Sequence, residues 1–524
     1  MNSVIMFISM VVFNLGFTYI NKKKFFFLFI VVIFFVICFS FFYRIYPNFN
    51  VEDKIIGTRI ENNDFLIGMK VNKKYASYNS LNHTFYVNGK IDNIYSIVLY
   101  SPYSVKYLLK KVDFNNYKVL VYSDKYYVYR NISFSNIPIM NISTFNQIIN
   151  KKNIIENQLS FFDSNIIGEI EKKVNINLYD YNFREHDSYE NNLFTSGSAK
   201  IRGASSRAYL KKSYKLKTDK KTSILGLSED NDFVLDALYV DKSKVRNKLS
   251  SDMWNLLNNN QNINNDLKSQ FVDLYVDMDY CGLYVMKNNV DTHVTNLSET
   301  GLIIKSIDHS NSSIINNLIF DSFDIIDGGF LNMEIKYYNE ESFNSFIRNL
   351  RMYYSGSMDY NAINSVFDFD NFINYKIFVM LISGEDNLTK NQYMSMQNEN
   401  SKILITPWDM DLTWGLSWSD SNSLFSDFSM DSSTDSDWIY DNITKYMDDK
   451  TLFLMKQRYL ELRKDVITMD TINNYLNSYK ELLVDSGAAS RDSERWYEYD
   501  VEYEIEQIRE WASRRIRFLD EYFK

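Results

Sequence analysis

The chain has very few residues of the types that build disulfide frameworks and metal clusters. Of its 524 residues, two are cysteine and four are histidine. Cys38 and Cys281 are too few and too far apart for a disulfide framework or a zinc cluster. The histidines form neither an HExxH pattern nor a pair four positions apart. Any catalysis therefore has to depend on carboxylate, amide and lysine side chains.

Glycine, proline and net positive charge are also scarce. With 16 glycines and 4 prolines, the sequence is neither collagen-like nor a proline-rich low-complexity chain. The 57 Lys and Arg residues against 66 Asp and Glu residues give a net charge of −9, so no overall positive field is available for nucleic-acid phosphates. We expect no nucleic-acid partner. The chain is 45% hydrophobic, which is enough apolar material for folded domains.

One long apolar run near the N-terminus predicts a membrane anchor. Residues 25–42 carry no charge and have about the ~20 residues that a helix needs to cross a bilayer. The lysines at 22–24 favour the cytoplasmic side, which places the chain beyond residue 43 outside the cytoplasm. A cleaved signal peptide is the alternative, although no small-residue cleavage site follows the run. The apolar stretch 4–20 is either a second short span or a misassigned start.

Local patterns predict different structures in the rest of the chain. Residues 51–134 contain short alternating segments separated by Asn, Asp and Ser, which indicates a small β-rich accessory module. A boundary is expected near Pro138. Asp241 is placed to cap a helix that carries Arg246 inward. Apolar residues three and four positions apart over 505–523 predict a long C-terminal helix with one buried face.

The first candidate site is a basic hairpin. Residues 198–221 predict two strands joined by a turn of small residues. Backbone N–H groups and serine hydroxyls in such a turn can approach phosphate oxygens, while Arg202 and a lysine supply positive charge. Alternation places Lys212 on the face of Tyr214 and Leu216, so we expect it to point inward. An ordinary basic surface hairpin is the alternative.

The second candidate site is a set of acidic and amide residues in the C-terminal half. Asp386 and Asn391 have the spacing at which kinase catalytic loops place the Asp that orients the attacking hydroxyl and the Asn that helps to bind Mg²⁺. Asp409 follows the predicted strand 402–406, which suits a carboxylate that holds Mg²⁺ against phosphate oxygens. Asp411 completes a D-x-D pattern. Taken alone, a D-x-D pattern is more often a solvated turn than a metal site.

Together, these motifs resemble those of the CotH-type spore-coat kinase family over about residues 135–524. The matching segments, in the family's order, are R-G-x-S-S-R-x-Y-x-K-K-S-Y-K-L-K from Arg202 to Lys217, L-G-L through V-R-N-K-L from Leu225 to Leu249, L-Y-V-x-x-x-Y-x-G-L-Y from Leu274 to Tyr284, D-N-x-x-x-N from Asp386, and P-W-D-x-D from Pro407. Members are atypical, secretory-like kinases that use ATP and a divalent metal to phosphorylate serines of spore-coat proteins. The resemblance implies an α+β fold with a diverged two-lobed protein-kinase-like domain.

The resemblance also implies limits for the lobes and roles for single residues. The N-lobe would span 135–291 and a mostly helical C-lobe 292–524, after the anchor region 1–50 and the β-rich module. Asp386 would be the catalytic carboxylate. The expected metal ligands are Asp409 and Asn391. Asp411 would be a further metal ligand, a residue that orients a ligand or a purely structural residue. The expected nucleotide-binding residues are Arg202, Ser206, Lys212 and Lys215, and the expected cofactors are ATP and Mg²⁺ or Mn²⁺.

Two departures from the family pattern leave other functions open. Ala204 stands where members commonly have Asn, and Asn288 stands where they often have Glu. A pseudokinase or structural coat protein of the same fold is therefore one alternative. A metal-dependent glycosyltransferase that uses the D-x-D motif is another.

The expected partners are a membrane, through the N-terminal helix, and a protein substrate. Residues 417–438 form an acidic, Ser-rich segment after Asp409, which favours a basic, Ser-rich coat or surface protein through opposite charge. A solvated loop is the alternative for this segment. The expected location is membrane-anchored with the catalytic domain outside the cytoplasm, at the spore coat or the forespore membrane.

Overall fold

A computed structural model describes the chain from residue 58 onward, with gaps. The described residues are 58–59, 66, 68–79, 82–89, 93–113, 116–143, 171–179, 192–203, 205–258, 267–276, 279–291, 295, 297–307, 329–330, 333–355, 359–416, 443–445 and 447–524. The predicted membrane span 25–42 and the acidic segment 417–438 lie outside them. Within the described residues, no helix has the length and hydrophobicity that a membrane crossing requires.

The chain divides into two compact units, residues 1–62 with 121–128 and residues 63–120 with 129–524. In the first unit, the two-residue strand β1 (Thr58–Arg59) pairs in parallel with Tyr126 and Tyr127. The second unit contains all eight predicted site residues.

Short strands occupy the region in which alternating segments predict β-structure. In the second unit, β2 pairs with β3 and β5, and β3 pairs with β4, all antiparallel. Residues 84–88 pair in parallel with residues 131–135. The strands of this region are β2 (Gly68–Val71), β3 (Lys74–Asn79), β4 (Thr84–Asn88), β5 (Ile97–Tyr100), β6 (Lys106–Lys111), β7 (Asn116–Tyr122) and β8 (Tyr126–Ser135). The predicted strands are confirmed, whereas the limits 51–134 of a separate module stay a prediction.

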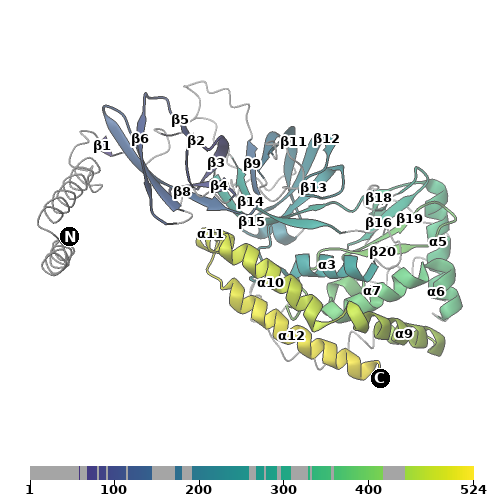
Figure 1. The fold of residues 1–524 in the computed structure, drawn as a ribbon. Helices are drawn as coiled ribbons and strands as arrows, with labels where there is room; N and C mark the ends of the chain where they lie inside the picture. The colour runs from purple at the N-terminus through teal and green to yellow at the C-terminus, as the bar shows by residue number, and fades with distance from the viewer. Residues whose placement is uncertain are drawn as a thin grey trace, which may run out of the picture. The chain divides into compact units, whose positions relative to one another are not determined.

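The next seven strands close into a barrel in the order β10-β11-β12-β13-β15-β14-β9 (Figure 1). The strands are β9 (Ile139–Ser143), β10 (Lys172–Tyr179), β11 (Asn192–Arg202), β12 (Ser213–Thr222), β13 (Asp230–Asp236), β14 (Ser269–Val276) and β15 (Asp279–Asn288). β11 and β12 form the predicted hairpin, with Gly197 to Arg202 paired against Thr218 to Ser213. The barrel closes through parallel pairing of β14 with β9.

Alternation along the barrel strands separates an apolar interior from a charged outer face. Tyr214 and Leu216 of β12 are fully buried, as are Phe233 and Leu235 of β13, and all four belong to the barrel core. Because successive side chains of a strand point to opposite sides, Lys215 between them points outward. Lys215 therefore lies on the outer face of the barrel.

The C-terminal region combines a second sheet with helices. A five-stranded sheet has the order β17-β18-β16-β19-β20. Its strands are β16 (Leu302–Ser306), β17 (Gly329–Phe330), β18 (Met333–Tyr337), β19 (Gln392–Met396) and β20 (Leu404–Pro407). The helices are α3 (Arg246–Asn258), α5 (Glu340–Ser355), α6 (Tyr360–Val366), α7 (Phe369–Ile382), α9 (Asp449–Asp465), α10 (Met469–Asp485), α11 (Ala488–Arg495) and α12 (Val501–Tyr522).

Acidic N-caps fix the starts of several helices. Asp368 accepts a hydrogen bond from the N–H of Asn371 at the start of α7, and Asp448 does the same for Thr451 of α9. Asp241 accepts from the N–H of Arg246 at 2.9 Å, and its other oxygen pairs with the Arg246 guanidinium at 2.6 Å. Arg246 is only 1% exposed, so the predicted cap and inward arginine of α3 are confirmed.

The predicted C-terminal helix is confirmed as α12, which lies beside α10 (Figure 1). Its buried side chains fall on one face, as the spacing of three and four predicts. They are Val501, Ile505, Ile508, Trp511, Ala512, Arg515, Ile516 and Leu519. Seven of these eight join the same apolar core as the buried helix α7, which α12 contacts directly.

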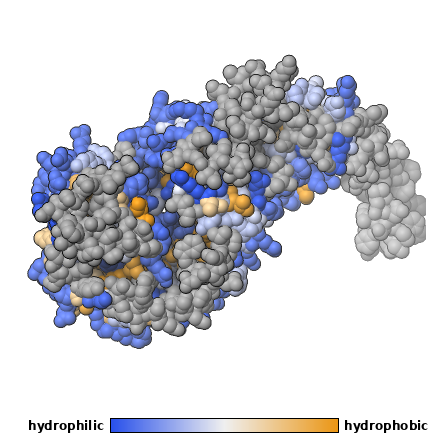
Figure 2. Space-filling model, turned by 180° about the vertical axis from the view of Figure 1, so that it is seen from behind, coloured by the Kyte–Doolittle hydropathy of each residue, from blue (hydrophilic) through white to orange (hydrophobic). Residues whose placement is uncertain are grey.

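The described chain combines antiparallel sheets with helices that do not alternate regularly with the strands, which agrees with the predicted α+β class. Figure 2 shows a mainly hydrophilic described surface on one side of the molecule, with small hydrophobic patches. The apolar side chains lie instead inside the barrel and in the core shared by the second sheet and the helices.

Candidate functional site

The Asp386 to Asn391 segment is a tight loop between the buried helix α7 and strand β19. Asp386 begins a single 3₁₀ turn, and Asn391 has a left-handed backbone with φ 51° directly before β19. Asp386 Oδ2 accepts hydrogen bonds from Asn391 Nδ2 and from Lys390 Nζ, each at 3.3 Å. The structure thus brings together the two residues that the spacing selects.

A residue that sequence reasoning passed over, Asn387, ties this loop to the end of β20. Its buried Nδ2 donates to the carbonyl oxygens of Asn391 and Trp408, each at 2.9 Å. Its own carbonyl accepts a hydrogen bond from the Tyr375 hydroxyl of α7 at 2.6 Å. The sequence signal for this role was an Asn directly after Asp386. A buried amide can donate two hydrogen bonds, whereas a carboxylate can donate none.

Asp409 lies next to this loop. The N–H of Trp408 donates to the Asn391 carbonyl at 2.8 Å, which extends the pairing of Gln392 with Pro407 by one residue. Asp409 follows with a left-handed backbone, φ 57°. Its carboxylate makes no hydrogen bond and no ion pair with any residue that the structure describes. It is therefore an available acceptor beside Asn391.

Asp411 lies in a region of excess negative charge. Burial raises the pKa of Asp411 well above its ordinary range, and the nearby carboxylates of Asp409, Asp236 and Asp241 raise it further. The ammonium group of Lys287 acts in the opposite direction. The arrangement favours the approach of positive charge.

Arg202 reaches the same place from the barrel. It ends β11, and its guanidinium lies 5.7 Å from the centre of the Trp408 ring. Gly203 follows with φ 109°, and a Cβ there would lie 1.9 Å from Ser206 Oγ, so only glycine allows the serine to fold back against the chain. Arg202 therefore lies on Trp408, the residue directly before Asp409. Ser206 lies against Gly203, the residue after Arg202.

The other two predicted nucleotide-binding residues are occupied by contacts within the barrel. Lys212 Nζ donates to the carbonyl oxygens of Arg207 and Tyr209 at 2.6 and 2.5 Å, which closes the turn of the hairpin. Burial lowers the pKa of Lys212. Lys215 Nζ forms an ion pair with Asp232 Oδ2 of the neighbouring strand at 2.6 Å.

The inward lysine of the hairpin is Lys211 and not Lys212. Lys211 is 1% exposed, and its ammonium donates to Asp492 Oδ1 at 2.5 Å and to the Leu283 carbonyl at 2.6 Å. The expectation for Lys212 assumed that the alternation of β12 extends backward. β12 begins at Ser213, so the residues before it do not follow the alternation.

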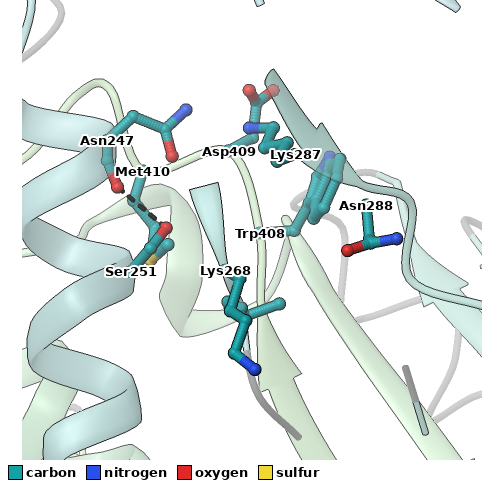
Figure 3. A pocket seen from close by; sticks show the side chains of 9 residues that line it. Asn247, Ser251, Lys268, Lys287, Asn288, Trp408, Asp409 and Met410 are labelled. Atoms are coloured by element: carbon teal, nitrogen blue, oxygen red, sulfur yellow. Dashed lines mark hydrogen bonds between the residues drawn. The ribbon is translucent and has the colours of Figure 1, made fainter. Parts of the chain in front are cut away.

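A small pocket adjoins Asp409 (Figure 3). Its lining residues are Asn247, Ser251, Leu267, Lys268, Lys287, Asn288, Trp408, Asp409 and Met410. In the view of Figure 3, Asn247 and Ser251 of α3 lie at one side of the pocket, and Trp408 and Asn288 lie at the other. The lining therefore combines residues of β15, α3 and the segment after β20.

Lys287 and Asp236, which sequence reasoning also missed, form the barrel wall behind Trp408. Lys287 Nζ lies 4.5 Å from the Trp408 ring centre and 3.0 Å from Asp236 Oδ2. Asn247 Nδ2 donates to the same oxygen at 3.0 Å. Burial alone would raise the pKa of Asp236, but Lys287 and Arg202 lower it below its ordinary value. Asp236 therefore stays ionised and pairs with Lys287 beside the ring.

Asn288, one of the departures from the family pattern, has a structural role. Its Oδ1 accepts from the Ser228 N–H and its Nδ2 donates to the Ser228 carbonyl, each at 3.1 Å. A glutamate could not donate the second bond. The other departure, Ala204, lies outside the described residues.

The described residues do not form a complete metal site by themselves. Among them, no three His, Cys, Asp or Glu side chains are grouped to hold a metal ion. Asp409, Asp411 and the Asn391 amide supply hard oxygen donors, the type that Mg²⁺ prefers, and Mg²⁺ commonly takes its remaining ligands from phosphate oxygens and water. The donor set fits a partial site for such an ion.

A comparison with protein-family models matches residues 199–519 to the family described as CotH kinase protein. This range covers more than half of the 524 residues. The chain belongs to the CotH kinase protein family. The match contains all eight predicted site residues and begins later than the predicted limit of residue 135, so it leaves out β9, β10 and the N-terminal strands of this CotH-family chain. A comparison with curated proteins found no match.

Proposed function

We propose that this CotH-family chain is an ATP-dependent serine protein kinase. The main support is the convergence of Asp386, Asn391 and Asp409, from two separate segments, beside a tryptophan that also receives Arg202 from the barrel. Kinase chemistry needs a carboxylate for the hydroxyl, oxygen ligands for a cation and positive charge for phosphates. This arrangement supplies one group for each need.

In the proposed reaction, the substrate serine oxygen attacks the γ-phosphorus of ATP. A bond from oxygen to phosphorus forms, the bond from the γ-phosphorus to the bridging oxygen breaks, and ADP leaves with that electron pair. Asp386 orients the serine hydroxyl and accepts its proton. Lys390, at 3.3 Å from the same carboxylate, and the Asn391 amide fix its orientation.

On the nucleotide side, Arg202 is the principal phosphate-binding residue of the proposal. Its guanidinium can form paired hydrogen bonds with phosphate oxygens while its flat face stays on Trp408. Ser206 can add a hydroxyl from the adjacent turn. Lys212 and Lys215 support the hairpin through their present partners and contribute positive potential at longer range.

The residues that would hold a divalent cation are Asp409 and Asn391, with Asp411 behind them. When bound, Mg²⁺ or Mn²⁺ neutralises charge that develops on the phosphate oxygens. Asp409 suits this role because its carboxylate has no partner within the described chain. Burial raises the pKa of Asp411, and the nearby carboxylates, Asp409 among them, raise it further.

The remaining assignments are part of the same proposal. The barrel region 135–291 would act as the N-lobe and residues 292–524 as the C-lobe of a diverged kinase. The substrate would be a basic, Ser-rich protein of the spore coat or cell surface, attracted by the acidic segment 417–438. The chain would reach it from a membrane anchor at residues 25–42.

The test is transfer of labelled phosphate from γ-labelled ATP to a basic, Ser-rich peptide, with an acidic Ser-rich peptide in parallel. We expect Asp386→Asn and Asp409→Asn each to lower the rate by about 10²- to 10⁴-fold. Asp465→Asn, which changes an exposed carboxylate at the end of α9, is the matched control and should leave the rate unchanged. Equal rates on the two peptides would remove the basic-substrate assignment.

Two outcomes would replace this proposal with its alternatives. If ATP and Mg²⁺ raise the melting temperature but no phosphate is transferred, the chain is a pseudokinase. If UDP-sugars and not ATP raise the melting temperature in the presence of Mn²⁺, the D-x-D motif serves a glycosyltransferase.

A further inference from the structure

Two cations from different parts of the fold lie on two aromatic rings that contact each other. Arg202 of the barrel lies over Trp408 with 5.7 Å between the guanidinium carbon and the ring centre. Lys305 of β16, in the second sheet, lies over Tyr393 with 5.7 Å from Nζ to the ring centre. The Tyr393 and Trp408 rings meet edge to face at 5.7 Å. A cation from the barrel and a cation from the second sheet therefore lie on one pair of contacting rings.

Lys305 has no anionic partner within the described chain. The residue opposite it on β18 is Glu334, but that carboxylate accepts a hydrogen bond from Lys336 instead. Lys305 forms no hydrogen bond or ion pair with the described residues, and the same is true of Arg202. Partly buried charges are normally paired, because burial removes the water that stabilises them.

The electrostatic surroundings place Lys305 near the catalytic motifs. Burial lowers the pKa of Lys305 to about 8, the Asp409 carboxylate raises it, and the Arg202 guanidinium lowers it. The next residue, Ser306, accepts a hydrogen bond from the N–H of Asn391 at 3.2 Å. Lys305 therefore directly precedes Ser306, whose carbonyl binds the Asn391 N–H. The charges of Asp409 and Arg202 both act on the Lys305 ammonium.

The neighbouring lysines already have partners. Lys287 pairs with Asp236, Lys215 pairs with Asp232, and Lys212 binds two carbonyl oxygens. Lys305 differs from these three because its positive charge is unpaired within the described chain. An anion bound beside Asp409 would supply the counter-charge that Lys305 lacks.

We propose that Lys305, together with Arg202, binds the terminal phosphate of the nucleotide. The two cations then neutralise a phosphate group that carries up to two negative charges, and the contacting Trp408 and Tyr393 rings hold both cations in the vicinity of Asp409. The inference rests on the proposed kinase function, because it assigns the ligand of the same site. Sequence reasoning missed Lys305, although a single lysine within the apolar strand Leu302–Ser306 was a signal.

The test compares ADP with the non-hydrolysable β,γ-imido analogue of ATP, each with Mg²⁺, by calorimetry and thermal melting of the full chain. We expect Lys305→Gln to lower the binding affinity for the analogue by about 10- to 100-fold, because a hydrogen bond between charged groups is lost. ADP lacks the terminal phosphate, so its affinity should change by less than about threefold. Lys305→Arg should recover most of the analogue affinity.

Lys402→Gln is the matched control, since Lys402 is an exposed lysine in the loop before β20 that donates a hydrogen bond to Asn364. It should leave both affinities unchanged. Without nucleotide, Lys305→Gln should melt at the same or a higher temperature than the wild type, because it removes an unpaired, partly buried charge. Loss of analogue affinity without loss of stability supports the inference.

Three results would overturn it. Equal weakening of ADP and the analogue would place Lys305 away from the terminal phosphate, and unchanged affinity for both would show that it binds no phosphate. A lower melting temperature without nucleotide, with no recovery in Lys305→Arg, would make its role structural. Failure of the wild type to bind either nucleotide would instead contradict the proposed kinase function, and the inference with it.

Discussion

Two of the predicted site residues, Asn391 and Asp409, have left-handed backbones, with φ of 51° and 57°. This region is unfavourable for most side chains and is best tolerated by Asn and Asp after glycine. Asn391 directly precedes β19, Asp409 follows the end of β20 by two residues, and each carries a side-chain oxygen. Local backbone strain of this kind is concentrated at functional sites. The same two residue types therefore suit this backbone and carry the oxygen donors of the proposed site.

Asn387 is expected to position the catalytic loop without contacting substrate. Asn387→Asp keeps the size of the side chain but removes the N–H groups that bind the Asn391 and Trp408 carbonyls. We expect a loss of stability of about 2–4 kcal/mol, since two buried hydrogen bonds are lost. Thermal melting should show a lower midpoint, and phosphate transfer should fall by at least about tenfold.

Asn400→Asp is the control for this change, because Asn400 is exposed in the turn between β19 and β20. Its melting temperature and transfer rate should match the wild type. An Asn387→Asp protein with unchanged stability would contradict the positioning role. Reduced kcat with unchanged KM for ATP would separate misplacement of Asp386 from loss of nucleotide binding.

At the scale of elements, the short helix α11 joins the C-terminal helices to the barrel through buried charges. Asp492 of α11 accepts hydrogen bonds from Lys211 at 2.5 Å and from the N–H of Leu283 at 2.8 Å, and its second oxygen lies 3.6 Å from Lys244 Nζ. Burial would raise the pKa of Asp492, but the two lysines lower it below its ordinary value. One carboxylate thus compensates two buried cations.

Asp492→Asn should destabilise the protein strongly. We expect a loss of about 3–5 kcal/mol at neutral pH, because both lysines would be left buried without a counter-charge. The pKa of Asp492 is depressed in the folded state, so its contribution is present above the pKa of the unfolded chain and is lost as pH falls through the folded value. The difference in melting temperature should therefore stay constant from pH 7 to 5 and shrink below about pH 4.

Asp485→Asn provides the comparison, since Asp485 is an exposed carboxylate at the end of α10. It should change the melting temperature by little at any pH. A difference between wild type and Asp492→Asn that does not depend on pH would show that Asp492 acts through packing and not through its charge.

At the scale of the whole molecule, barrel closure depends on residues outside the family match. β9 and β10 precede residue 199, yet β9 pairs with both β10 and β14. The barrel core includes Met140 and Ile142 of β9, both at most 1% exposed. Without these strands, the barrel would be left with two open edges and an uncovered core.

A fragment of residues 199–524 is therefore expected to fold poorly. A fragment of residues 135–524 keeps all seven barrel strands and is the matched comparison. We expect cooperative thermal melting for the longer fragment, and no cooperative transition with rapid proteolysis for the shorter one. Equal melting temperatures would show that β9 and β10 are dispensable, whereas failure of both fragments would contradict the predicted limit at residue 135.

Local patterns predicted individual elements of this fold well. The hairpin of β11 and β12, the strand before Asp409, the cap of α3 and the buried face of α12 were all readable, because each depends on residues close together in sequence. The barrel was not readable, since its closing pair joins β9 to β14, which are more than 100 positions apart. The alternation rule also failed at Lys212, one residue before its strand begins.

The sequence by itself determined which residue types are available to the site and, through the spacing of Asp386 and Asn391, that two of them lie together. Only the tertiary structure decided that Arg202, Lys287 and Lys305 meet around Trp408 and Tyr393. The physical reason is the distance along the sequence over which each kind of interaction acts. Backbone preferences and hydrogen bonds act over a few residues, whereas the pairing of buried charges depends on which distant strands the core brings together.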